Sequence, residues 1–89
     1  VLEGGIRVPC IARWPGRLPA GEVSAVPAMT VDLTATILAA AGARPPEGRT
    51  LDGIDLVPIL DGSQPASERT LFWRVERFGQ CAARKGKWK

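Results

Sequence analysis

The stretch from Glu3 to Gly16 constrains the fold most, because a glycine pair is followed there by an alternating run that ends at Trp14-Pro15-Gly16. Gly4 and Gly5 allow a sharp turn or a close approach of another segment. Side chains of residues 6–13 alternate between two sides, which is typical of a strand. A strand needs hydrogen-bonded neighbours, and none follows nearby. We therefore expect a strand over 6–13 whose neighbours lie upstream of residue 1.

The middle of the chain predicts one longer and one shorter helix. Residues 30–41 are rich in alanine and carry apolar side chains at helical spacing, and Thr30 or Asp32 can cap the first turn. The face expected to be buried consists of Leu33, Ile37, Leu38, Ala40 and Ala41. A short helix is expected over 55–60, with Asp55 as its cap.

The last part of the chain predicts antiparallel strands. Residues 70–75 are rich in aromatic and β-branched side chains, and residues 80–84 follow as a second strand. Lys85-Gly86 is typical of a hairpin turn, and it leads into a third strand that begins at Lys87. The order is then strand, helix, short helix and antiparallel strands. This is the pattern of an α+β fold, or of the tail of an α/β domain joined to a small antiparallel sheet.

Composition limits the chemistry that the chain can carry. The 89 residues allow one small domain at most, and no apolar run approaches the ~20 residues of a membrane span. There is no histidine, so a Ser-His-Asp or Cys-His mechanism cannot be built from this chain alone. Cys10 and Cys81 are expected as buried thiols, with a disulfide as the alternative.

Acidic and basic side chains are distributed unevenly. Three aspartates, Asp52, Asp55 and Asp61, do not match the spacing of a calcium-binding loop and are expected in caps and turns. Residues 69–89 carry seven cations against one acid, Glu76, with aromatic side chains interleaved. Such a segment could bind nucleic acid or another anion. Strand alternation with charges on the outside explains the same pattern without a partner, and we favour that interpretation.

Five segments together resemble the type I sulfatases, the arylsulfatase-like enzymes that depend on formylglycine. They are EGGIRVP at 3–9 with RWPGR at 13–17, VDLTATIL at 31–38 with AG at 41–42, LDGIDLVPIL at 51–60, LFWR at 71–74 and AARKGKWK at 82–89. Each segment alone is weak, but the five occur in order and cover nearly the whole chain. One departure is Ala35, where the family often has proline.

The resemblance implies the C-terminal part of an alkaline-phosphatase-like α/β sulfatase fold. Residues 1–62 would end the α/β sulfatase domain, and residues 63–89 would begin a C-terminal antiparallel subdomain. The implied activity of the parent protein is hydrolysis of sulfate esters on a small molecule or glycan. An upstream sulfatase domain would be needed to complete the core. The resemblance also suggests a periplasmic, secreted or lysosomal location.

The catalytic equipment of that family is not expected in this chain. The family uses a calcium ion and a formylglycine made from the first residue of a C-x-P-x-R or S-x-P-x-R motif, and neither Cys10 nor Cys81 lies in one. The sulfate-contacting lysine of the family would fall before residue 1. We therefore expect no catalytic residue and no metal ligand, and no sulfatase activity from the chain alone.

Two arginines have expected roles. By resemblance, Arg74 would line the substrate pocket, because the C-terminal sheet of the family often borders it; the alternative is a solvated arginine on a strand face. Arg7 is expected to pair with a carboxylate inside the fold.

Two other functions remain open. One is a non-catalytic anion-binding module for nucleic acid or sulfated glycan, and the other is a fragment of a related phosphoesterase. The sulfatase interpretation expects neither nucleic-acid binding nor a membrane span.

Overall fold

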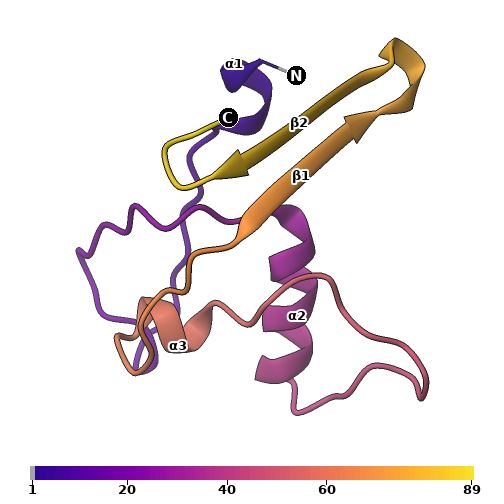
Figure 1. The fold of residues 1–89 in the computed structure, drawn as a ribbon. Helices are drawn as coiled ribbons and strands as arrows, with labels where there is room; N and C mark the ends of the chain where they lie inside the picture. Colours follow the sequence, from indigo (N-terminus) through magenta and orange to yellow (C-terminus); the bar gives the residue numbers. More distant parts are fainter. Residues whose placement is uncertain (1) are drawn as a thin grey trace. The chain divides into compact units, whose positions relative to one another are not determined.

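The computed structural model describes residues 2–89 (Figure 1). These residues form two compact units. The first unit consists of the described part of Val1–Ala12 together with Ser67–Lys89, and the second is Arg13–Ala66. In this structure the first residues join the C-terminal strands in one unit. The boundary at residue 62 between two domains of the parent protein stays a prediction. Ion pairs from Glu3 to Arg84 and Lys89 connect these two parts of the first unit.

The first unit begins with a short helix, at the place where the sequence predicted a glycine turn leading into a strand. Helix α1 spans Glu3–Ile6, and its last turn closes with a hydrogen bond from the N–H of Arg7 to the carbonyl of Glu3 at 2.7 Å. The expected strand over 6–13 is wrong for this structure: residues 7–13 have no regular secondary structure, and Ile11 is 95% exposed. Within residues 2–89 no segment pairs with them, and an alternating pattern forms a strand only beside a neighbour.

The C-terminal part of the first unit is a β-hairpin (Figure 1). Strand β1 spans Thr70–Val75 and strand β2 spans Gln80–Lys85, and they pair antiparallel from Thr70↔Lys85 to Val75↔Gln80. A 3₁₀ turn, η1 at Glu76–Phe78, joins them. Gly79 follows this turn at φ 59°, a left-handed conformation that favours glycine.

The third strand expected at Lys87 is reduced to one bridge. Lys85 and Trp88 exchange backbone hydrogen bonds of 2.9 and 3.0 Å, so the turn is formed by Gly86-Lys87 rather than Lys85-Gly86. Glycine at 86 fits this turn because its φ is 55°. The sheet described by residues 2–89 therefore has two strands.

The second unit contains helix α2 at Thr30–Ala40 and helix α3 at Val57–Leu60. Helix α2 ends one residue before the expected boundary. Its buried side chains are Asp32 and Ala35, whereas Leu33 and Ile37 are 44% and 66% exposed. The expected buried face is thus wrong for this chain, because the side of α2 that carries Asp32 is held by hydrogen bonds to a later segment.

That segment, residues 53–57, lies against α2 through three contacts. The N–H of Ile54 donates to Asp32 Oδ1 at 3.0 Å, and the N–H of Leu56 donates to Thr36 Oγ1 at 3.0 Å. Gly53 lies so close to the backbone of residues 31–32 that it has no room for a Cβ atom. Leu56 and Val57 are buried with Ala35, so this junction forms the small core of the second unit.

Aspartates stabilise the ends of the helices, as expected. The N–H of Met29, the residue before α2, donates to Asp32 Oδ2 at 2.7 Å, and the N–H of Val57 donates to Asp55 Oδ1 at 3.0 Å. Helix α3 starts two residues later than expected. Asp61 follows α3 and accepts the N–H of Ser63 at 2.9 Å. Hydrogen bonds from the side chain and the N–H of Ser63, with a weaker effect of Arg17, lower the pKa of Asp61.

Both cysteines are exposed and free, so the expectation of buried thiols is wrong. Cys10 lies in the irregular segment after α1, and Cys81 lies opposite Arg74 in the hairpin register. None of the helices formed by residues 2–89 has the length and apolar character needed to cross a bilayer.

Candidate functional site

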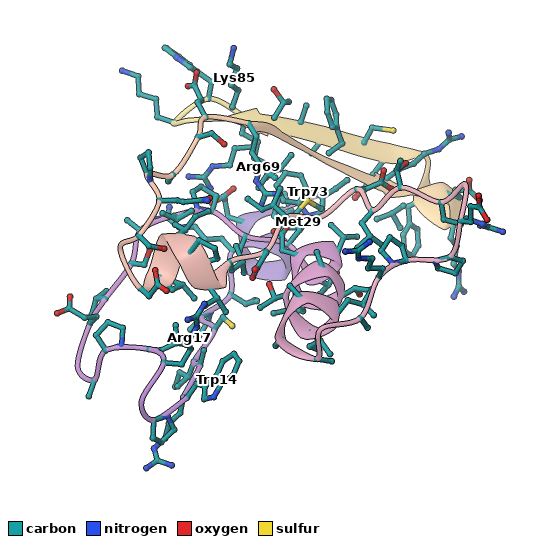
Figure 2. All side chains as sticks on the ribbon, turned by 90° about the horizontal axis from the view of Figure 1, so that it is seen from below. Trp14, Arg17, Met29, Arg69, Trp73 and Lys85 are labelled. Carbon is teal, nitrogen blue, oxygen red and sulfur yellow. The ribbon has the colours of Figure 1, made fainter. Side chains whose placement is uncertain are left out.

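The hairpin presents two different faces because its side chains alternate across the pleat. On one face Leu71 is 5% exposed and Trp73 is half-buried. Figure 2 shows Trp73 and Lys85 on opposite sides of the hairpin ribbon. The other face, which we call the open face, consists of three cross-strand pairs: Thr70↔Lys85, Phe72↔Ala83 and Arg74↔Cys81.

The open face combines an apolar platform with positive charge. A shallow depression at the centre of the hairpin is lined by Phe72, Trp73, Arg74, Cys81, Ala82 and Ala83, of which Phe72, Arg74, Cys81 and Ala83 belong to the open face. Phe72 is 67% exposed, and it lies two positions before Arg74 on the same strand face and across from Ala83. An aromatic side chain of this kind offers a planar apolar surface to a ligand. On this face of β2, Cys81 and Ala83 have small side chains, which leave the space above the strand open.

Arg74 projects from this face into solvent. Its side chain is 76% exposed, and its Nε lies 3.8 Å from Glu76 Oε1, which is even more exposed. An exposed pair at this distance contributes little free energy in water, so the guanidinium can exchange it for another anion. The five donors of arginine match the oxygens of a sulfate or phosphate group. The structure therefore places the predicted site residue on an accessible surface.

Lys85 gives the open face its second cation. Its Nζ lies 3.9 Å from Glu68 Oε2, and both side chains are largely exposed. Lys85 and Arg74 occupy the same face but lie near opposite ends of the hairpin register. Negative groups on a ligand could therefore meet either cation along one surface.

A second charged cluster surrounds Glu3 and was not predicted as a unit. The carboxylate lies 3.3 Å from Lys89 Nζ, 3.7 Å from Arg7 and 4.0 Å from Arg84. The expected pairing of Arg7 with a carboxylate is therefore found, although both side chains are exposed rather than internal. Three cations around one acid leave net positive charge beside α1.

The aspartates do not gather into a metal site. Among residues 2–89, no three His, Cys, Asp or Glu side chains are grouped so that they could hold a metal ion. The carboxylate of Asp32 is fully buried and accepts two backbone N–H groups, which is a structural role. The residues present therefore do not fit the calcium ion that the sequence resemblance implies for the parent family.

Sequence reasoning missed Phe72 as part of the candidate site, and it missed Glu3 as the centre of the charged cluster. Phe72 could have been found from strand alternation, because it falls on the same face as the predicted Arg74. Glu3 gives no local signal, since two of its three partners, Arg84 and Lys89, lie at the other end of the chain.

Over most of its length, the chain matches one class of protein, the sulfatases. It is 48% identical over 72 residues to N-acetylgalactosamine-6-sulfatase of Canis lupus familiaris, a match that covers 81% of this chain. It is 47% identical over 71 residues to steryl-sulfatase of Mus musculus and 46% identical over 65 residues to arylsulfatase D of Homo sapiens, which cover 80% and 73% of this chain. No family model matches the chain.

The chain is therefore homologous to a segment of the sulfatases. It spans 14% of the length of the canine relative and 11% of the length of each of the other two. These identities confirm the sulfatase resemblance that was drawn from the five sequence segments.

Proposed function

We propose that this chain is the C-terminal portion of a sulfatase that hydrolyses sulfate esters, and that it supplies part of the substrate pocket rather than the catalytic centre. The homology to three differently named sulfatases carries the proposal. The names of these relatives share sulfate as the group acted on, so the parent is expected to take a sulfated small molecule or glycan.

Hydrolysis of a sulfate ester needs a nucleophile, groups that stabilise the negative sulfuryl oxygens, and a proton donor for the leaving group. This chain offers candidates for the second requirement only. It has no histidine and no C/S-x-P-x-R motif; in the nearest approach, Ser63-Gln64-Pro65-Ala66-Ser67, serine replaces the arginine. The nucleophile and the calcium ligands of the parent are therefore assigned to the rest of the polypeptide.

Arg74 is the residue through which this segment would meet substrate. Its exposed guanidinium shares a strand face with the ring of Phe72, so one face can bind an anionic group and an adjoining apolar or ring-shaped body. Its weak pairing with Glu76 leaves it available, whereas Arg7 and Arg84 already share Glu3.

Replacing Arg74 with alanine is expected to lower kcat/KM for a sulfated substrate about tenfold or more, because a charge-assisted hydrogen bond is lost. The assay uses canine N-acetylgalactosamine-6-sulfatase in which the homologous segment is exchanged for this chain. Arg74→Lys keeps the charge but not the planar fork, so it should recover part of the loss.

The matched control for this experiment is Arg77→Ala. Arg77 lies in η1 at 5.7 Å over the ring of Phe78, outside the open face, and its replacement should leave kcat/KM within about twofold. If Arg74→Ala behaves like Arg77→Ala, Arg74 is a solvated strand-face arginine and the pocket role is wrong.

A further inference from the structure

The carboxylate of Glu3 is surrounded by three cations, and we call Glu3, Arg7, Arg84 and Lys89 together the Glu3 cluster. Lys89 makes the closest ion pair, with its Nζ 3.3 Å from Glu3 Oε1. The guanidinium groups of Arg7 and Arg84 share the other oxygen, Oε2, at 3.7 and 4.0 Å. These two distances exceed those of a hydrogen bond. Both guanidinium groups therefore keep N–H donors for another acceptor.

Arg84 is held more firmly than an ordinary surface arginine. It pairs with Leu71 in the register, so it lies on the buried face of the hairpin, opposite the open face. Its Nε donates to the carbonyl of Gly86 at 3.1 Å, and its side chain is only 25% exposed. A guanidinium that is already oriented loses little freedom when it binds an anion, and partial burial strengthens the attraction.

The unit that contains this cluster is positively charged as a whole. Its residues, 2–12 and 67–89, carry eight Lys or Arg side chains against three Glu. Residues 13–66 carry four Arg against six acids, so the excess of positive charge belongs to the first unit. An accumulation of one sign of charge raises the local concentration of ions of the opposite sign.

We propose that the Glu3 cluster is a binding site for a tetrahedral oxyanion of the sulfate class. One such anion can accept hydrogen bonds from both guanidinium groups, because a terminal nitrogen of each lies within 4.0 Å of the same oxygen, Glu3 Oε2. Three cations and one carboxylate leave a formal charge of +2, which matches a divalent anion. The proposal is independent of the proposed function, because Arg84 and Arg74 lie on opposite faces of the hairpin.

Titration of the 89-residue chain with sodium sulfate tests the proposal. Sodium chloride keeps the ionic strength constant, so that general screening cannot imitate binding. In nuclear magnetic resonance spectra, the backbone N–H signals of Arg7 and Arg84 should shift along one saturating curve. The signal of Arg77, in η1 at the other end of the hairpin, should stay in place. Equal shifts at Arg77, or shifts without saturation, would overturn the proposal.

Replacing Arg7 or Arg84 with glutamine should raise the dissociation constant for sulfate about tenfold or more, because a charge-assisted hydrogen bond is lost. Arg77→Gln is the matched control. It removes the same charge from the same unit, and it should change the dissociation constant by less than about twofold. Arg7→Gln is informative even if Arg84→Gln unfolds the chain, because the side chain of Arg7 is 73% exposed. An unchanged dissociation constant for Arg7→Gln, or equal weakening by Arg77→Gln, would overturn the proposal.

Methyl sulfate distinguishes two sources of the anion, the free sulfate ion and the sulfate group of an ester. Saturable binding of both compounds would show that the cluster accepts an ester group, and binding of inorganic sulfate alone would show that it takes the free dianion. Either result supports the site. Absence of saturable binding for both compounds would overturn it.

Chemical modification extends the test to the canine enzyme that carries this chain as its homologous segment. Phenylglyoxal reacts with accessible guanidinium groups, and mass spectrometry reports the extent of reaction at each arginine. Sulfate should slow the modification of Arg7 and Arg84 more than that of Arg77. Equal protection of all three would overturn the proposal, whereas turnover of a sulfate ester, measured separately on the same protein, reports on the proposed function alone.

Discussion

Replacing Gly53 with alanine is expected to lower the free energy of unfolding by about 3 kcal/mol, at the upper end of the usual cost of overpacking. A Cβ atom at this position would overlap the carbonyl of Val31 and lie 2.7 Å from the N atom of Asp32. These are backbone atoms at the start of α2, so they cannot move aside as a flexible side chain would. Residues 53–57 must then separate from the helix, and the hydrogen bond from Ile54 to Asp32 is lost.

The control for Gly53 is a second glycine with free space. Gly4 lies in α1, and no atom lies within 4 Å of the position that its Cβ atom would occupy. Gly4→Ala should therefore be neutral or stabilising by up to about 1 kcal/mol through helix propensity. Both variants are compared by urea unfolding. A change of less than about 0.5 kcal/mol for Gly53→Ala would show that the close approach of the two segments is not required.

Replacing Asp32 with alanine has the second large expected effect. It should lower the free energy of unfolding by about 3 kcal/mol, because two part-buried N–H groups lose a charged acceptor. Those groups belong to Met29, at 2.7 Å, and Ile54, at 3.0 Å. Asp32→Asn keeps one acceptor oxygen, so it should cost about half as much. The measurement is again urea unfolding of each variant.

Asp52 provides the matched aspartate for this comparison. It is exposed and lies next to Gly53, and Asp52→Ala should change the free energy of unfolding by less than about 0.5 kcal/mol. Similar losses for Asp32→Ala and Asp52→Ala would mean that the buried carboxylate does not hold the two segments together.

Local patterns predicted those elements whose hydrogen bonds are local. Helix α2 and the strands of the hairpin were found within a residue of their observed bounds, since helical spacing and strand composition are properties of the segment itself. The strand expected over 6–13 required a neighbour, and the structure described for residues 2–89 offers none. A pattern of alternation cannot show whether its partner is present.

Contacts between distant residues explain the remaining differences. The buried side of α2 is determined by Asp32 and Thr36, which accept hydrogen bonds from the N–H groups of residues 54 and 56. Hydrophobic spacing alone predicted that Leu33 and Ile37 would be buried instead. For the candidate site, alternation was enough to place Arg74 on a strand face. The cluster around Glu3 depends on residues at both ends of the chain, so no local window contains it.

The central claim is that this chain shapes a sulfatase but does not carry its chemistry. The most direct test is turnover of an aryl sulfate with added calcium, measured side by side for the purified 89-residue chain and for the canine sulfatase that carries it as its homologous segment. The account predicts no turnover by the chain alone and measurable turnover by the exchanged enzyme. Metal-dependent turnover by the isolated chain would contradict it.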